Sequence, residues 1–219
     1  PSSAGAVAAH YGGSAVDVLL GTAPQRGKAL GAALTFGAEA ILDERKRSNL
    51  RGRGGAGFGT GRKWELCRQA TGSAHYVICN ADEGEPGTFK DRVLLTRHAD
   101  MVFEGMTIAA LAVGARQGLV YLRGEYRYLL EPLRAVLERR HEQRLLGSSI
   151  MDHAGFDFDI DIHVGAGAYV CGEESSLIES LEGKRGTPRI RPPFPVEHGY
   201  LGLPTTVNNV ETFCAAAHI

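Results

Sequence analysis

The sequence has no hydrophobic run approaching the roughly 18 residues that a membrane-spanning helix needs. Its first sixteen residues are small and uncharged, without the basic segment and long apolar core of a signal peptide. Charge of one sign is not in excess either, because the formal net charge is −1. We therefore expect neither direct membrane insertion nor nucleic acid as a partner.

Cysteine pairs of the metal-binding kind are also missing. No two cysteines stand close enough for a C-x-x-C motif, which removes the usual zinc and iron–sulfur signatures. Each cysteine lies in an apolar pattern that favours a buried, reduced thiol. We predict no metal site in these residues and a cytoplasmic location, or the cytoplasmic face of a membrane complex. The cysteines are Cys67, Cys79, Cys171 and Cys214.

Glycine, in contrast, is abundant, with 29 of 219 residues against an average of about 7%. The densest stretch is RGRGGAGFGTGRKW (51–64), in which five of the first nine residues are glycine. Such a run lets a flat or charged ligand lie directly on the backbone, whose free N–H groups then face it. The chain is also long enough for one domain with a real core.

The side chains of this glycine-rich loop suit a nucleotide. Arg53, Arg62 and Lys63 carry positive charge that could meet phosphate groups. Phe58 and Trp64 offer aromatic faces on which a ring could stack.

The loop contains a formal G-x-G-x-x-G match at Gly52, Gly54 and Gly57. The Rossmann interpretation of that motif needs a strand directly before it, whereas 39–49 reads as a charged helix end. We interpret the loop, Gly55 included, as a nucleotide or flavin cradle of another kind. The alternative is a flexible structural linker.

Hydrophobic periodicity predicts helices alternating with strands. Buried strands are expected at 76–79 and 118–123, and a half-exposed edge strand at 156–164. This alternation predicts an α/β fold with a mostly parallel, Rossmann-like sheet and flanking helices. Helices are expected at 28–46, 60–69 with Thr60 as its cap, 88–97, 100–113, 126–140 and 176–181.

Polar residues follow the first predicted strand in the segment NADEGEPG (80–87). Asn80, Asp82 and Glu85 lie there, at the end of a parallel strand where ligands bind. The alternative is a solvated turn, because Asn, Asp, Gly and Pro are turn formers.

A second glycine-rich passage from strand to helix spans 165–175. Glu173 and Glu174 would open the following helix, either as ligand contacts or as carboxylates that suit the helix dipole. Phe194 lies in a proline-rich loop and could be a fixed stacking surface, or an ordinary packed aromatic residue.

The last motif is PTTVNNVET (204–212), which reads as the start of a helix. Thr206 or Asn208 could cap that helix, with Glu211 completing a capping box. Such a start is also a ready phosphate site. Two glycine loops, a polar strand end and this segment together fit a mononucleotide cofactor site.

These motifs together resemble the NADH-binding flavoprotein subunit of respiratory complex I. Similar relatives are the diaphorase subunit of NAD-reducing hydrogenases and the flavoprotein subunit of NAD-dependent formate dehydrogenases, to which EGEP (83–86) looks closer. The matching stretches cover most of residues 48–219: RGRGGAGFGTGRKW (51–64), YVICNADEGEPGTFKDR (76–92), YLRGEY (121–126), GAGAYVCGEESSLIESLEGKRG (165–186) and RPPFPVEHGYLGLPTTVNNVET (191–212).

The resemblance implies FMN in a Rossmann-like domain with NADH stacked on it, so hydride passes between cofactors and no side chain is catalytic. Residues implied to hold FMN are Gly54, Gly55, Lys63, Asn80, Asp82, Gly84, Tyr169, Gly172, Glu173, Asn208 and Asn209. Residues expected in the same cofactor cradle are Gly52, Arg53 and Gly57. Residues implied to face NADH are Phe58, Glu85, Glu174, Arg191 and Phe194.

The implied function is that of an NADH:acceptor oxidoreductase (diaphorase) module. It would pass electrons to iron–sulfur subunits of a multi-subunit complex, with NAD-reducing hydrogenase as the first choice and complex I or formate dehydrogenase as alternatives. An alternative of another class is a non-catalytic scaffold without flavin.

The expected domains are an N-terminal arm and helix (1–47) and the FMN/NADH-binding domain (48–219). The ubiquitin-like domain of the family is not in these residues, and its 4Fe-4S cluster is expected only in a missing C-terminal region. The sequence is therefore expected to be part of a longer polypeptide.

Overall fold

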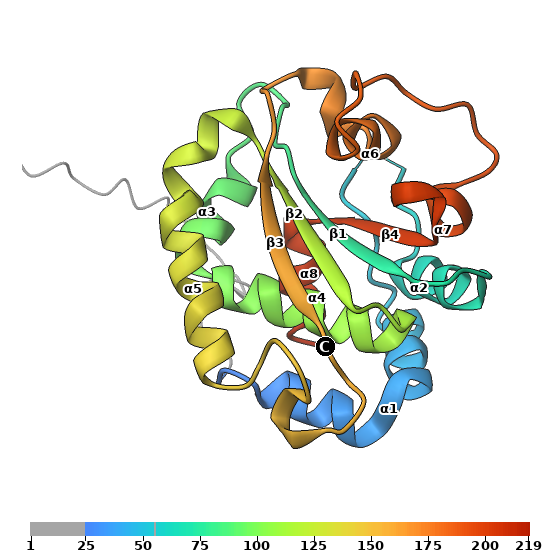
Figure 1. Ribbon diagram of the computed structural model, residues 1–219, viewed down its shortest axis with the longest axis vertical. Coiled ribbons are helices and arrows are strands. Elements are labelled where there is room, and N and C mark those ends of the chain that lie inside the picture. The colour runs from blue at the N-terminus through green and yellow to red at the C-terminus, as the bar shows by residue number, and fades with distance from the viewer. Residues whose placement is uncertain (1–24, 55) are drawn as a thin grey trace, which may run out of the picture.

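The computed structural model describes residues 25–54 and 56–219, which form a parallel sheet with flanking helices (Figure 1). The strands are β1 (Tyr76–Ala81), β2 (Gln117–Leu122), β3 (Asp159–Val164) and β4 (Thr205–Asn209). The helices are α1 (Lys28–Arg47), α2 (Thr60–Gln69), α3 (Lys90–Arg97), α4 (Ala99–Val113), α5 (Leu130–Glu142), α6 (Glu174–Leu181), α7 (Pro195–His198) and α8 (Val210–Ala216). Short 3-10 turns are η1 (Gly124–Leu129), η2 (Ile150–Asp152), η3 (Tyr169–Gly172) and η4 (Tyr200–Gly202).

The strands form one sheet in the order β3-β2-β1-β4, and every neighbouring pair is parallel. This confirms the predicted α/β class with a parallel, Rossmann-like sheet. The chain moves outward from β1 to β2 and β3, then returns to place β4 on the other side of β1. The carboxyl ends of β1 and β4 are therefore the topological switch point, where open α/β sheets bind ligands.

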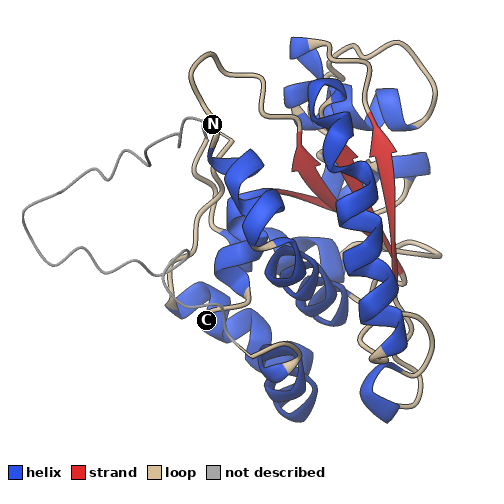
Figure 2. Cartoon of the chain, turned by 90° about the vertical axis from the view of Figure 1, so that its left-hand side faces the viewer, coloured by secondary structure: helices blue, strands red, loops and turns tan. Residues whose placement is uncertain are grey.

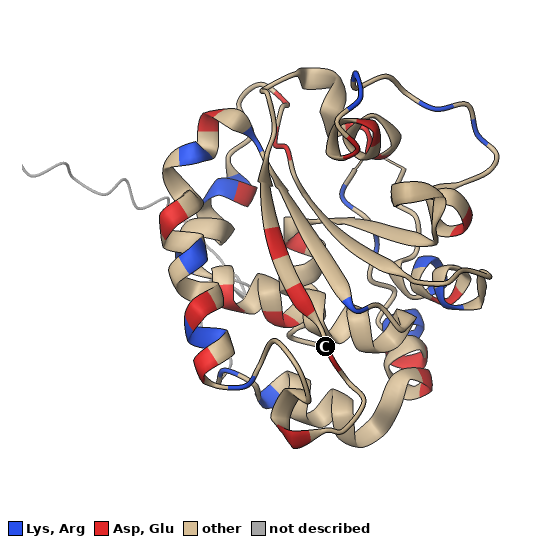
Figure 3. Ribbon diagram, viewed as in Figure 1, with Lys and Arg blue, Asp and Glu red and all other residues tan. Residues whose placement is uncertain are grey.

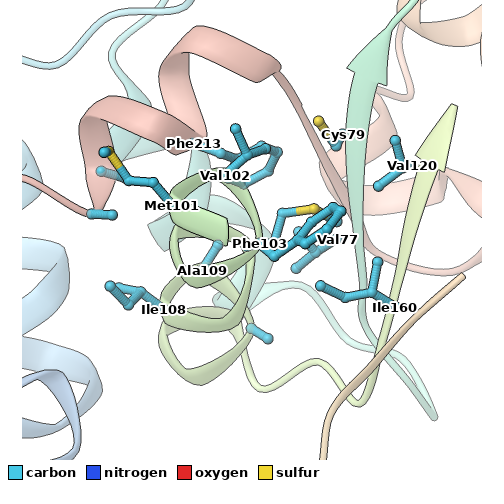
Figure 4. Packing of buried hydrophobic residues seen from close by; sticks show 14 of the residues in the cluster. Val77, Cys79, Met101, Val102, Phe103, Ile108, Ala109, Val120, Ile160 and Phe213 are labelled. Carbon is cyan, nitrogen blue, oxygen red and sulfur yellow. The ribbon is translucent and has the colours of Figure 1, made fainter. Parts of the chain in front are cut away.

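Each face of the sheet has its own core, because alternate strand residues point to opposite sides. Val77 and Val120 belong to the larger core, where they pack with residues of α4 and α8 (Figure 4). Residues of α1 and α5 complete this core. Ile78 and Leu119 face the other side, where they pack in a smaller cluster with Leu177 of α6. Figure 2 shows from the side how the helices flank the strands.

Helix α4 lies at the centre of the larger core. Its sequence is almost entirely apolar, and nearly all of its residues are buried. Its backbone approaches α8 so closely that a Cβ atom at Gly105 would lie 1.9 Å from the carbonyl oxygen of Phe213. This contact requires a residue without a side chain.

Strand β4 is the one strand of the described sheet that the sequence did not reveal, and the short helix α7 was not predicted either. The stretch 205–209 was expected at the start of a helix, yet it pairs with β1, and its two threonines are fully buried. The prediction that Thr206 or Asn208 caps the last helix is wrong. Asn209 caps α8 instead, because its side chain accepts a hydrogen bond from the Glu211 N–H at 3.0 Å.

The starts of α3 and α6 differ by two residues from the predictions, and those of α2 and α5 differ in kind. Gly59 rather than Thr60 stands at the N-cap of α2, without a side-chain cap. The helix expected from residue 126 begins as the 3-10 turn η1 and becomes α-helical at Leu130. As expected, the element directly before the glycine-rich loop is a helix, α1.

Strand β3 confirms the predicted edge strand, and acidic side chains line it at the open edge of the sheet (Figure 3). All four cysteines are buried and free, as predicted. Among the described residues, no helix combines the length and apolar character needed to cross a membrane.

Candidate functional site

Most of the predicted site residues converge at the carboxyl ends of β1 and β4. The end of β1 is tied to η3 through Asn80, whose Nδ2 donates to the carbonyl oxygen of Gly172 at 2.9 Å. Next to it, the Tyr169 hydroxyl donates to Glu85 at 2.6 Å. Gly84 gives the Tyr169 ring room, because a Cβ atom there would lie 3.1 Å from that ring. Residues 80–85 and 169–172 therefore form one wall.

Asp82 is a buried carboxylate at this wall, with only 8% of its surface exposed. One of its oxygens, Oδ2, has no hydrogen-bond partner among the described residues. Burial raises the pKa of Asp82 to about 6, although the Arg123 guanidinium acts to lower it. A buried, unpaired oxygen is costly, so this atom calls for a donor from a ligand. A small hollow beside it is lined by Asp82, Gly84, Arg123, Gly167, Ala168 and Tyr169.

Replacing Asp82 with asparagine is expected to stabilise the protein at neutral pH in the absence of FMN. The pKa of Asp82 in the folded state lies above its usual value of 3.8. The contribution of Asp82 to the free energy of unfolding is therefore fully present below pH 3.8, and it is lost as the pH rises through about 6. Asp82→Asn should therefore raise the free energy of unfolding by about 1 kcal/mol near pH 7.5 and leave it unchanged near pH 4.

Urea unfolding at the two pH values measures this difference. The exposed Asp43 of α1 provides the control Asp43→Asn, which should not show the gain at neutral pH. Equal stability of Asp82→Asn and the parent at neutral pH would contradict the raised pKa of Asp82 in the folded protein.

The start of α6 contributes Glu173 as the helix cap. Its carboxylate accepts hydrogen bonds from the N–H groups of Ser175 and Ser176, both at 3.0 Å. Burial acts to raise the pKa of Glu173, but these hydrogen bonds and the nearby Arg191 leave it below its usual value. The capping interpretation of Glu173 is therefore confirmed.

Glu174, the next residue, is held between two cations. One carboxylate oxygen lies 3.3 Å from Lys63 Nζ, and the other lies 3.1 Å from Arg191. Lys63 also donates to the carbonyl oxygen of Val207 at 3.0 Å. Lys63 thus joins α2, α6 and β4 at one point.

The loop that carries Arg191 and Phe194 is fixed to α6 by another arginine. Arg189 lies 2.5 Å from Glu179 and 2.9 Å from Glu182. Arg191 reaches the start of α6 from this anchored loop, and the Phe194 side chain keeps 50% of its surface exposed.

Asn208 lies near the carboxyl end of β4. Asn208 is buried, and its Oδ1 accepts from Trp64 Nε1 at 2.9 Å and from Thr206 at 3.2 Å. Its Nδ2 atom has no partner in the described part of the chain. Trp64 is fully buried and stacks on Phe213, so the prediction that it could stack on a ligand ring is wrong.

The glycine-rich loop lies against the start of α8. Gly52 donates to the carbonyl oxygen of Phe58 at 2.9 Å, and Arg53 lies 3.0 Å from Glu211. No atom of the described residues stands within 4 Å of a Cβ position at Gly54 or Gly57, so both face space that the described part of the chain leaves open.

Other loop residues are less involved. Gly55 lies outside the described residues. Phe58 keeps 47% of its surface exposed, which leaves its ring available for stacking. Arg62 turns away to an ion pair with Glu65 at 2.5 Å, so it does not serve the loop as predicted.

Sequence reasoning missed several residues that hold this site together. Glu83 binds the N–H groups of Asp91 and Arg92 at the start of α3, and Lys90 lies 2.8 Å from Asn209. Glu83 and Lys90 stand inside a quoted motif, but each also has a sequence-distant partner: the Tyr126 hydroxyl donates to Glu83 at 2.9 Å, and Lys90 donates to Asn209. Only the fold brings them together.

The residues of this site fit FMN. The buried Asp82 oxygen and Asn208 nitrogen lack partners among the described residues, the loop glycines face open space, and Lys63 supplies positive charge. An acceptor, a donor, bare backbone and a cation are what a hydroxyl-rich, phosphate-bearing ligand requires.

Comparisons with known proteins agree with this fit. The Nuo51 FMN-binding domain family matches residues 46–218. The alpha subunit of the NAD-reducing hydrogenase HoxS from Cupriavidus necator is 65% identical over 181 residues, which are 83% of this chain and 30% of the relative. A relative from Aquifex aeolicus, which belongs to its NADH-quinone oxidoreductase, is 51% identical over 185 residues, which are 84% of this chain and 43% of the relative.

A solved structure shares the fold as well. The crystal structure of NAD+-reducing NiFe-hydrogenase in the H2-reduced state has a TM-score of 0.81 at 51% identity. It covers 89% of this chain, which in turn spans 32% of the hydrogenase chain. The chain thus spans less than half the length of these relatives. The family match covers most of the sequence, so this chain belongs to the Nuo51 FMN-binding domain family.

Proposed function

We propose that this chain exchanges hydride between NAD(H) and bound FMN, as the electron-entry module of a larger oxidoreductase. The observation that carries the proposal is the junction at Lys63, which joins α2, α6 and β4, together with two buried polar atoms, Asp82 Oδ2 and Asn208 Nδ2, that have no partner among the described residues. Both atoms lie at the carboxyl ends of β1 and β4, which is the switch point where a parallel sheet binds a nucleotide cofactor.

FMN, when bound, would supply the hydride chemistry. The side chains of the chain position the cofactors and balance their charge. Lys63 and the loop amides offset negative charge, while Asp82 and Asn208 offer one acceptor and one donor. Phe58 and Phe194 have exposed ring surface for the second nucleotide. For the other site residues that the resemblance indicated, we propose the same two roles: to hold FMN or to face NADH.

The larger context is part of the same proposal. The chain would feed electrons to iron–sulfur subunits of a multi-subunit complex on the cytoplasmic side. The 65% identity to the HoxS alpha subunit favours an NAD-reducing hydrogenase over a complex I or formate dehydrogenase assembly.

An absorption spectrum of the purified protein with its copurifying subunits tests the proposal. Flavin absorption that bleaches when NADH is added is the expected result. A colourless protein that takes up no added FMN would overturn the proposal and leave the non-catalytic scaffold in its place.

Replacing Glu174 with alanine is expected to raise the use of NADPH relative to NADH. In the parent, the Glu174 carboxylate would accept from the adenosine ribose and repel a 2′-phosphate. Its loss leaves Lys63 and Arg191 without this carboxylate partner, which favours an added phosphate. The ratio of kcat/KM for NADPH over NADH should rise about tenfold.

Steady-state kinetics with both nucleotides measures this ratio. Glu131→Ala removes a carboxylate that pairs with Arg134 on the surface of α5 and serves as the control. An unchanged ratio in Glu174→Ala would count against this role.

A further inference from the structure

Three side chains form a closed triangle between the start of α3 and the junction of β4 with α8. Lys90 Nζ lies 2.6 Å from Asp91 Oδ1 and 2.8 Å from Asn209 Oδ1. The third side is the hydrogen bond from Asn209 Nδ2 to Asp91 Oδ2 at 2.7 Å. Of these three residues, the resemblance indicated only Asn209 as a cofactor contact, not Lys90 or Asp91.

This triangle allows only one orientation of the Asn209 amide. Lysine can only donate and a carboxylate can only accept, so Oδ1 must face Lys90 and Nδ2 must face Asp91. The Glu211 N–H also donates to Oδ1, at 3.0 Å. A flipped amide would place Nδ2 against two donors and Oδ1 against a carboxylate.

The Asp91 carboxylate makes its side-chain hydrogen bonds to Lys90 and Asn209. Only 2% of its surface is exposed, which is expensive for a carboxylate. An acid in the first turn of a helix often serves the exposed N–H groups there. In α3 the Glu83 carboxylate already binds the N–H groups of Asp91 and Arg92, at 2.9 and 3.2 Å. The Asp91 carboxylate is thus left to Lys90 and Asn209.

The Asn209 amide nitrogen carries two hydrogens, and Asp91 binds one of them. The other makes no hydrogen bond to the described residues. We propose that Lys90 and Asp91 are positioning residues, which lock the Asn209 amide so that its second N–H serves an acceptor atom of FMN. The inference rests on the proposed function, because it needs FMN beside the end of β4.

Exchanging the carboxylate at position 91 with the amide at position 209 separates a positioning role of Asp91 from a purely structural one. In the full chain, Asp91→Asn and Asn209→Asp are made singly and together. The double variant keeps the triangle, because an aspartate at 209 accepts from Lys90 and the α8 backbone while an asparagine at 91 donates to it. The N–H that would face the cofactor is replaced by a carboxylate oxygen.

Two measurements are made on each variant: the FMN dissociation constant from flavin fluorescence, and the thermal midpoint of the FMN-free protein. Each single variant should weaken FMN binding about tenfold or more. The double variant should regain the thermal midpoint of the parent while its FMN binding stays weak. Glu131→Gln on α5 is the control, with parental values of both quantities.

The inference is overturned if the double variant regains both the thermal midpoint and the FMN affinity, because the triangle would then be structural only. Parental FMN affinity in Asp91→Asn would overturn it as well. A parent chain that binds no FMN would instead contradict the proposed function, so the two failures are distinguishable.

Discussion

Replacing Lys63 with methionine is expected to weaken FMN binding about a hundredfold, on the order of 3 kcal/mol. The Lys63 side chain is only 19% exposed and contacts both Glu174 and the Val207 carbonyl oxygen. Its removal takes a positive charge from beside the proposed phosphate-bearing ligand. It also leaves Glu174 with Arg191 as its remaining ion-pair partner among the described residues.

Arg62→Met is the matched control for this experiment. Arg62 is the neighbouring residue on α2, but its guanidinium pairs with Glu65 on the surface. Fluorescence titration should give the control the affinity of the parent. Parental FMN affinity in Lys63→Met, with the fold intact by circular dichroism, would show that this lysine does not serve the cofactor.

Replacing Gly105 with alanine is expected to destabilise the protein by about 4 kcal/mol or more. The added methyl carbon would lie 1.9 Å from the Phe213 carbonyl oxygen and 2.6 Å from its carbon, and both are backbone atoms. Neither can turn aside as a flexible side chain would, so α4 and α8 must separate. Because α8 follows β4 directly, cofactor binding should weaken as well.

Thermal or urea unfolding measures this loss, and Gly31→Ala in α1 provides the control. Among the described residues, the new Cβ atom there would meet only the Met151 side chain, at 3.4 Å. A helical glycine with room for a methyl group should gain up to about 1 kcal/mol on this change. Similar stability of the two variants would contradict the close packing of α4 on α8.

The sequence predicted the helices other than the short α7, and the two central strands, because their burial leaves apolar patterns. Strand β4 left no such pattern, since four of the five residues of TTVNN are polar threonines and asparagines, which are typical of helix caps. Its threonines are buried by pairing with β1, a long-range effect that no local window reveals.

In the site, too, local features could be predicted and long-range contacts could not. The motifs located the segments of the site, and the signal for Glu173 as a helix cap was local. The triangle of Lys90, Asp91 and Asn209 was not predictable, because its members belong to different segments and meet only after the sheet has formed. Trp64 was misjudged for a similar reason, since its burial depends on α8.

The strand order has a consequence for synthesis on the ribosome. Among the four described strands, β4 emerges last, yet its partner in the sheet is β1, which emerges first of the four. Pairing across so much chain is slow, because the intervening segment must be closed before the contact forms. Until then the β1 edge is open and one wall of the site, with Asn208 and Asn209, is missing. We therefore expect flavin to be inserted late, after nearly all of these residues have left the ribosome.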